Sequence, residues 1–194
     1  MKRIVVRRAQ TRRERYDQNI STAQTFPLEL CTINFMHDGN LGYLIRAAAC
    51  FGVEKIHVIG SCSPRSVLNP LSGSLYDYVQ IQQYSSPREF LDMAKTNQLA
   101  LISAEISESS ISLFSYTFPR ARPLCLVVGQ EQHGIPVDIL VNSEAQLEIP
   151  MPGVGFCLNT SQAANILLYE ATKQLVNETQ TNKEAYLQSR RQSI

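Results

Sequence analysis

The chain has 194 residues, of which 44% are hydrophobic, and it carries a formal net charge of +1 at pH 7. This length suits one domain with a substantial hydrophobic core. No apolar run approaches the roughly 18 residues that a membrane span requires, and no apolar segment typical of a secretory signal follows the charged N-terminus. We therefore expect a protein that neither enters a membrane nor is exported.

The five cysteines lie far apart, form no CxxC pair and are odd in number. Such a pattern argues against a disulfide framework or a zinc site and favours a reducing compartment, so we expect a cytoplasmic protein. The three histidines also lack the spacing of metal ligands, and we expect no bound metal. The residues concerned are Cys31, Cys50, Cys62, Cys125, Cys157, His37, His57 and His133.

Positive charge is concentrated at the N-terminus. Seven of the 18 basic residues fall within the first fifteen positions and only Glu14 opposes them, so this arm is about +6 and the remainder about −5. Arginine outnumbers lysine 13 to 5, which favours bidentate contacts with phosphate. A basic arm over residues 1–27, in which residues 10–26 are expected to be flexible or to form a short helix, is a plausible anchor for a nucleic-acid backbone. A solvated basic leader is the alternative.

Alternating and periodic apolar residues predict a strand–helix–strand unit near the start of the domain. Its parts are a strand over 28–33, a helix over 41–51 and a strand over 55–60. Asp38 or Asn40 is expected to cap the helix, and Gly52 to end it. A unit of this kind implies a right-handed parallel crossover and therefore an α/β fold with a mostly parallel sheet flanked by helices.

The rest of the chain continues the α/β pattern, without an internal repeat or a second domain. The predicted elements are a loop over 61–74, a weak strand over 79–81, a helix over 87–94, strands over 99–105 and 124–129, a helical turn over 137–140, a strand over 146–150 and a helix over 160–178. We expect one domain over residues 28–178, followed by a polar tail over 179–194.

Two residues within these elements have ambiguous patterns. His57 alternates with Ile56 and Val58, which predicts an outward-facing strand residue rather than a ligand. Arg46 lies in an otherwise apolar helix, as a surface residue or as a positioned functional group. Base rates favour the surface interpretation of Arg46.

Three predicted strand ends lead into loops that are candidates for a ligand site: residues 103–105, 129–131 and 149–159. Ligands of open parallel sheets bind outside the carboxyl ends of the strands. The third loop is rich in proline and glycine and enters a helix, so a ligand can approach its backbone closely, although an ordinary strand–loop–helix junction has a similar composition. The chain contains no GxGxxG, Walker A or GxSxG sequence, which argues against dinucleotide, nucleoside-triphosphate and hydrolase sites.

Residues 38–53, 127–135 and 149–164 resemble motifs 1, 2 and 3 of the SpoU/TrmH family of RNA 2′-O-ribose methyltransferases. The three matches occur in order and at family-like spacing, and they cover most of residues 28–175. The resemblance implies the SPOUT fold, an α/β domain with a deep trefoil knot near its C-terminus. It also implies a homodimer with its active site at the interface.

In this family the motif 2 and motif 3 loops enclose S-adenosylmethionine, largely through main-chain groups. The resemblance places six residues around its adenine and ribose: Ala104, Gly129, Ile149, Met151, Cys157 and Leu158.

Motif positions also suggest catalytic residues, namely Arg46, Asn40, Glu131 and Asn159. The motif 1 arginine is associated with activation of the ribose 2′-OH. A guanidinium is a poor general base because it stays protonated, so we expect Arg46 to position and stabilise, with base catalysis left open.

Two residues depart from the family pattern: Gln132 stands where glycine is usual, and Cys157 where serine is usual. Gln132 could stiffen or fill the motif 2 loop, and a thiol is the weaker hydrogen-bonding group. A non-catalytic RNA-binding protein that retains the fold is therefore the alternative function, and a flavodoxin-like small-molecule binder is a third.

Only about 27 residues precede the first predicted strand, too few for an additional RNA-binding domain. Selection of tRNA or rRNA is then expected to rest on the arm, the tail and the dimer surface, with tRNA slightly favoured.

Overall fold

The computed structural model describes residues 11–20, 23–33 and 36–177. Residues 25–174 form one compact unit, and the residues that precede and follow them form a second. The basic residues within 1–10 and the predicted tail over 179–194 lie outside the described residues.

The described part of the N-terminal arm is a helix, α1 (Arg12–Ile20), and none of its residues is buried. Thr11 and Glu14 form a reciprocal cap: the Thr11 N–H donates to Glu14 Oε2 (2.8 Å), and the Glu14 N–H donates to Thr11 Oγ1 (3.3 Å). The hydrogen bonds from the Thr11 N–H and hydroxyl lower the pKa of Glu14. Of the two alternatives for this arm, the short helix is correct for residues 12–20.

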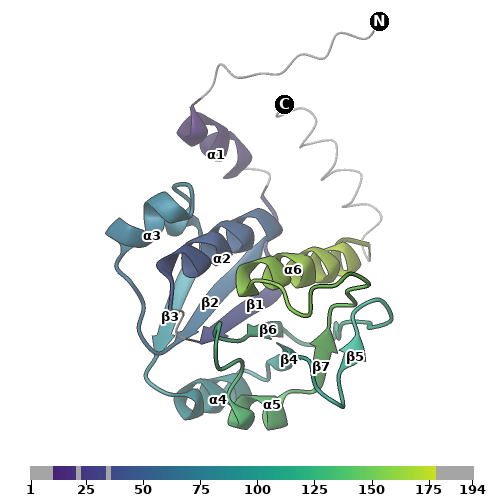
Figure 1. Ribbon diagram of the computed structural model, residues 1–194. Coiled ribbons are helices and arrows are strands. Elements are labelled where there is room, and N and C mark those ends of the chain that lie inside the picture. The colour runs from purple at the N-terminus through teal and green to yellow at the C-terminus, as the bar shows by residue number, and fades with distance from the viewer. Residues whose placement is uncertain (1–10, 21–22, 34–35, 178–194) are drawn as a thin grey trace, which may run out of the picture. The chain divides into compact units, whose positions relative to one another are not determined.

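A seven-stranded sheet organises the larger unit, and all pairings between its strands are parallel (Figure 1). Its spatial order is β3-β2-β1-β6-β4-β7-β5. The strands are β1 (Phe26–Ile33), β2 (Val53–Ile59), β3 (Gln80–Tyr84), β4 (Ala100–Ala104), β5 (Ile111–Ser112), β6 (Leu124–Val128) and β7 (Ala145–Glu148). The predicted mostly parallel α/β sheet is thus confirmed, and the two-residue β5 was not anticipated.

Helices cover both faces of this sheet (Figure 1). α2 (Asp38–Phe51) and α6 (Thr160–Asn177) lie over one face, and α4 (Pro87–Thr96) and α5 (Val137–Asn142) lie under the other. Because both faces are covered, β6 is buried along its whole length, as its unbroken apolar sequence indicates. No helix in the described ranges is long and apolar enough to cross a membrane.

Two local predictions are wrong. The segment 61–74 is not only a loop, because it contains α3 (Arg65–Leu71) with Pro70 inside it, followed by the short η1 (Tyr76–Tyr78). Neither Asp38 nor Asn40 caps α2, since the helix begins at Asp38 and His37 takes the N-cap position. The predicted end of this helix is confirmed: Gly52 has φ 70° and its N–H donates to the Ala48 carbonyl.

The prediction that His57 faces outward is also wrong. Its side chain is fully buried between the sheet and α4, where its ring lies 5.4 Å from that of Phe90. Nε2 is 2.6 Å from Glu29 Oε2, and Nδ1 is 2.9 Å from Tyr84 Oη. A carboxylate only accepts, so Nε2 carries the hydrogen. Alternation correctly placed His57 on one face of the sheet, but α4 covers that face.

Candidate functional site

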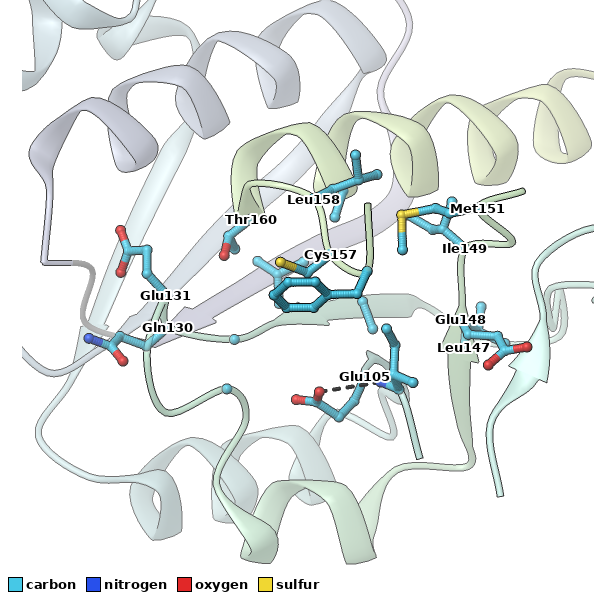
Figure 2. Close-up of a pocket in the computed structure, with 17 residues that line it drawn as sticks. Glu105, Gln130, Glu131, Leu147, Glu148, Ile149, Met151, Cys157, Leu158 and Thr160 are labelled. Atoms are coloured by element: carbon cyan, nitrogen blue, oxygen red, sulfur yellow. Dashed lines mark hydrogen bonds between the residues drawn. The ribbon is translucent and has the colours of Figure 1, made fainter. Parts of the chain in front are cut away.

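The carboxyl ends of β6, β4 and β7 are neighbours in the sheet and border a cavity of about 340 Å³ (Figure 2). Residues from four segments line it: 104–106; 128–131 and 134; 147–149 and 151; and 156–158, 160 and 163. A cavity of this size falls in the range of small-molecule sites. Its position at the ends of parallel strands is also where α/β folds bind ligands.

All six residues expected at the cofactor line this one cavity: Ala104, Gly129, Ile149, Met151, Cys157 and Leu158. They come from all four of these segments, and the strand ends among them meet because β6 pairs with β4, which pairs with β7. The fold therefore gathers these residues in space, while their contact with a cofactor stays a prediction.

The charged residues of the lining all have one sign. Glu105, Glu131 and Glu148 contribute carboxylates, and no Lys, Arg or His is found among the described residues that line the cavity. Such a site suits a ligand that is cationic or rich in hydrogen-bond donors. Glu105, like Phe156 and Thr160, was not predicted as a site residue, although Glu105 is the first charged residue after an apolar strand in one of the three loops singled out above.

The loop that follows β6 is a tight hairpin closed by its own groups. The Gln130 N–H donates to the Gly134 carbonyl (3.0 Å), and the Gly134 N–H donates to that of Gln130 (2.9 Å). Gln130 Oε1 accepts from the N–H groups of Gln132 (3.0 Å) and His133 (2.8 Å). A Cβ on Gly129 would lie 2.5 Å from the carbonyl carbon of Gly134, so this position requires glycine.

Gln132, the first departure from the family pattern, does not fill this loop towards the cavity. Its side chain is exposed and it does not belong to the lining. Gln130 is the residue whose side chain stiffens the loop. Cys157, the second departure, is exposed and does line the cavity.

Three of the residues predicted to be catalytic form one hydrogen-bonded network. Asn40 Nδ2 donates to Glu131 Oε1, and Asn159 Nδ2 donates to Asn40 Oδ1 (3.1 Å). The Met36 N–H donates to the other carboxylate oxygen of Glu131 (3.1 Å). The network joins α2, the loop after β6 and the loop before α6, and so connects all three motifs.

Asn159 also begins α6. Its Oδ1 accepts from the Ser161 N–H (2.9 Å) and hydroxyl (2.6 Å), and its carbonyl accepts from the N–H groups of Gln162 and Ala163. This is the bonding of an N-cap asparagine. With its oxygen held by the helix, the amide NH₂ of Asn159 is directed to Asn40.

The carboxylate of Glu131 is held in its ionised form. Partial burial on its own would raise the pKa of Glu131, but hydrogen bonds from the N–H groups of Glu131 and Met36 and from Asn40 outweigh it and lower the pKa. Glu131 therefore acts as a fixed negative charge and acceptor at neutral pH, not as a proton donor.

Arg46, the fourth predicted catalytic residue, does not line the cavity. It is exposed on α2, as the surface interpretation expects, and it lines a second hollow of about 660 Å³ together with Asn40, Tyr43 and Asn159. Asn40 and Asn159 border this hollow, and Glu131 borders the first cavity. The network thus lies between the two spaces and brings Arg46 into the same region of the molecule.

Comparison with known proteins matches the part of the chain that contains the three motifs. A model of the SpoU rRNA methylase family matches residues 27–169. A tRNA (guanosine(18)-2′-O)-methyltransferase of Escherichia coli strain K12 is 25% identical over 150 residues, which cover 77% of this chain and 65% of that protein. The chain thus spans somewhat less than two thirds of that relative's length.

Two further matches extend this picture. An uncharacterized tRNA/rRNA methyltransferase of Synechocystis is 34% identical over 140 residues, covering 70% of this chain and 49% of the relative. The crystal structure of an AdoMet-bound rRNA methyltransferase from Sinorhizobium meliloti superposes with a TM-score of 0.72 at 22% identity, covering 78% of this chain and 58% of that one. At this identity the structural match shows the shared fold.

Proposed function

The chain belongs to the SpoU rRNA methylase family, and from this membership we propose that it is an S-adenosylmethionine-dependent RNA methyltransferase that modifies a ribose 2′-OH of tRNA or rRNA. The observation that carries the proposal is the network of Asn40, Glu131 and Asn159, which joins the three motifs at the rim of one cavity. Relatives with tRNA and rRNA 2′-O-methyltransferase names support it.

S-adenosylmethionine fits the lining residues in size and in charge. When bound, it supplies an electrophilic methyl group on a positively charged sulfur. A volume of about 340 Å³ suits a ligand of that size. Glutamates, with no Lys, Arg or His among the described lining residues, suit its positive charge. We assign its contacts to the six residues predicted above, with Ile149, Met151 and Leu158 as apolar walls and Ala104 and Gly129 allowing close backbone approach.

The chain's own residues would hold the substrate hydroxyl in line with the methyl group. The bound donor would supply the methyl group: a bond would form between the 2′-oxygen and the methyl carbon as the carbon–sulfur bond breaks, S-adenosylhomocysteine would leave, and the hydroxyl proton would pass to solvent water. Positioning of reacting atoms alone can lower the barrier by about 7–11 kcal/mol. We assign this positioning to the Asn40–Glu131–Asn159 network and charge stabilisation to Arg46, whose guanidinium suits a neighbouring RNA phosphate.

We further propose a homodimer whose interface completes the site. Arg46 lines the second hollow and not the cavity, so a site made by one chain would leave the two apart. Large apolar side chains are exposed on α2, on α6 and in the loop between β7 and α6: Tyr43, Ile166, Tyr169, Val154 and Phe156. Exposed apolar groups of this kind are typical of an interface.

The proposal extends to the threading and domain organisation that the family implies. We propose that the chain beyond β6 forms a trefoil knot, that residues 28–178 are the catalytic domain, and that residues 1–27 and 179–194 contact RNA. The exposed Arg12, Arg13 and Arg15 of α1 support an RNA contact. The spread, unpaired cysteines favour a cytoplasmic location.

Ribose methylation is the direct test. The purified chain is incubated with methyl-labelled S-adenosylmethionine and with tRNA or rRNA from cells that lack it, and methylated nucleosides are mapped by mass spectrometry. We expect label on one or a few ribose 2′-oxygens. RNA binding without any binding of S-adenosylmethionine in calorimetry would instead select the non-catalytic RNA-binding alternative, which Cys157 motivates.

A further inference from the structure

Glu105 is a charged residue of the cavity that lies outside the three motifs and outside the catalytic network. It directly follows β4, and its N–H donates to the Leu147 carbonyl of β7 (3.1 Å), which fixes its backbone at the cavity edge. The side chain is partly buried and belongs to the lining. In Figure 2 its carboxylate lies below the cavity, on the side away from Leu158 and Thr160.

The carboxylate of Glu105 keeps free acceptor capacity. Oε2 accepts from the Ile135 N–H (3.3 Å), and Oε1 accepts from the Ile106 N–H (3.3 Å). A carboxylate has about four acceptor positions, so these two backbone hydrogen bonds leave roughly half of them for a ligand.

The other two glutamates of the cavity are already engaged by side chains. Glu131 accepts from Asn40, and Glu148 Oε2 accepts from the Ser110 hydroxyl (2.9 Å). Figure 2 shows the carboxylate of Glu148 directed away from the centre of the cavity. Glu105 is therefore the carboxylate best placed to receive hydrogen bonds from a bound molecule.

Glu105 is also pressed against the loop after β6. Its Oε2 lies 2.7 Å from the place that a Cβ on Gly134 would occupy, and Gly134 has φ 64°. The carboxylate thus touches the hairpin that carries Gly129 and Glu131 and joins it to the end of β4. A ligand bound to Glu105 would therefore be held in a fixed position relative to both the hairpin and the end of β4.

We propose that Glu105 binds the ribose 2′,3′-diol of the nucleoside part of the methyl donor, an inference that rests on the function proposed above. A carboxylate with free acceptor positions matches two adjacent hydroxyl donors, and acidic residues bind ribose hydroxyls in this way in dinucleotide sites of other α/β folds. The small or apolar neighbours Ala104, Ile106 and Gly134 offer no competing donor side chain. Glu105 is thus a specificity residue for the ribose rather than a catalytic one.

The test pairs a ligand series with a size-matched variant. Binding of S-adenosylhomocysteine, its 2′-deoxy and 3′-deoxy analogues and its analogue without the α-amino group is measured by calorimetry on the full chain. In the wild type, loss of a ribose hydroxyl should weaken binding roughly 10–100-fold, as expected for a hydrogen bond to a charged group. In Glu105→Gln, which retains one acceptor for the Ile135 N–H, that loss should shrink to within about threefold.

Glu148→Gln is the matched control, because it removes the same charge from the same lining while its carboxylate points away. It should show the wild-type response to each deoxy analogue. The inference is overturned if loss of a ribose hydroxyl weakens binding equally in the wild type and in Glu105→Gln. It is also overturned if the two proteins differ only in their response to the analogue that lacks the amino group. If the wild type binds none of these nucleosides, the proposed function itself is wrong, so the two failures are distinguishable.

Discussion

Two hydrogen-bonded networks in the same unit each contain a glutamate and have similar chemistry, but their surroundings differ. In one, Glu29 and Tyr84 hold His57 inside the core between the sheet and α4. In the other, Glu131 and Asn159 hold Asn40 in the first turn of α2, beside the cavity. Each consists of a carboxylate, a central side chain that bridges, and a third polar group.

The difference lies in what each network can still contact. The core network is closed: His57 has no exposure, and Tyr84 is 6% exposed. Its hydrogen bonds satisfy groups that would otherwise be costly to bury, so its effect is on stability. The network at the cavity has its central Asn40 buried but Asn159 exposed, so it positions groups that a ligand can reach. Polar networks of equal appearance thus serve the fold or the site according to their access to solvent.

The largest effect should come from breaking the closed network. Glu29→Ala removes the acceptor of a buried imidazole N–H, and we expect it to lower the free energy of unfolding by about 3–5 kcal/mol in urea titrations. The control is Glu144→Ala, which removes an exposed partner of Arg122 and should cost less than about 1 kcal/mol. Equal costs for the two variants would show that the core network does not stabilise the fold.

Substitutions beside the network at the cavity should change activity and not stability. Arg46→Ala is expected to reduce single-turnover methyl transfer by about 100-fold or more, since removing one group that stabilises a transition state costs that much in other enzymes. Its free energy of unfolding should stay within about 0.5 kcal/mol, because the side chain is exposed. Arg88→Ala, an exposed arginine on α4, is the charge-matched control and should retain full activity. Unchanged transfer in Arg46→Ala would remove Arg46 from the mechanism.

The contrast between the networks also shows where sequence reasoning succeeds. The central strands and main helices were predictable because long apolar runs with the right period define them, and the three motifs predicted residues that the sheet order then brings to one cavity. Ala104, Gly129 and Ile149 lie at strand ends, and parallel pairing places all such ends on one edge of a sheet.

The errors have physical causes in particular residues. The alternation around His57 correctly predicted that its side chain lies on the opposite face of the sheet from its neighbours. Helices cover both faces of a parallel sheet, so a polar residue on either face can be buried if hydrogen-bond partners reach it. Those partners, Glu29 and Tyr84, come from other strands and cannot be read locally. At Asn40 the cap prediction failed because α2 begins two residues earlier, which leaves the amide to bind Glu131.

A smaller effect is the pH dependence of stability that the core network contributes. Burial first, and then the charge of Glu29, raises the pKa of Tyr84 to about 12 from an ordinary value of 10. The neutral phenol is favoured in the folded state, so this contribution is fully present below pH 10 and is lost as the pH rises to 12. Two pKa units correspond to at most about 3 kcal/mol.

Urea titrations between pH 9 and 12 test this contribution. Burial also raises the pKa of Cys31 and Cys125, so the wild type should lose stability over this range for more than one reason. Tyr84→Phe should lose less with rising pH than the wild type does, and the exposed Tyr43→Phe should follow the wild type. Parallel curves for wild type and Tyr84→Phe would contradict the prediction.

The smallest effect is expected from replacing cysteine by serine, which can be compared at the cavity and in the core. Cys157 is exposed at the cavity, whereas Cys125 is fully buried in β6. Cys157→Ser replaces a weak donor by a stronger one where a ligand can use it, so we expect S-adenosylhomocysteine to bind about 2–5-fold more tightly in calorimetry with unfolding unchanged. Cys125→Ser buries a hydroxyl in an apolar core and should cost about 1–3 kcal/mol without a direct effect on binding. If Cys157→Ser lowered stability as much as Cys125→Ser does, the cavity would be a packed part of the core and not an open site.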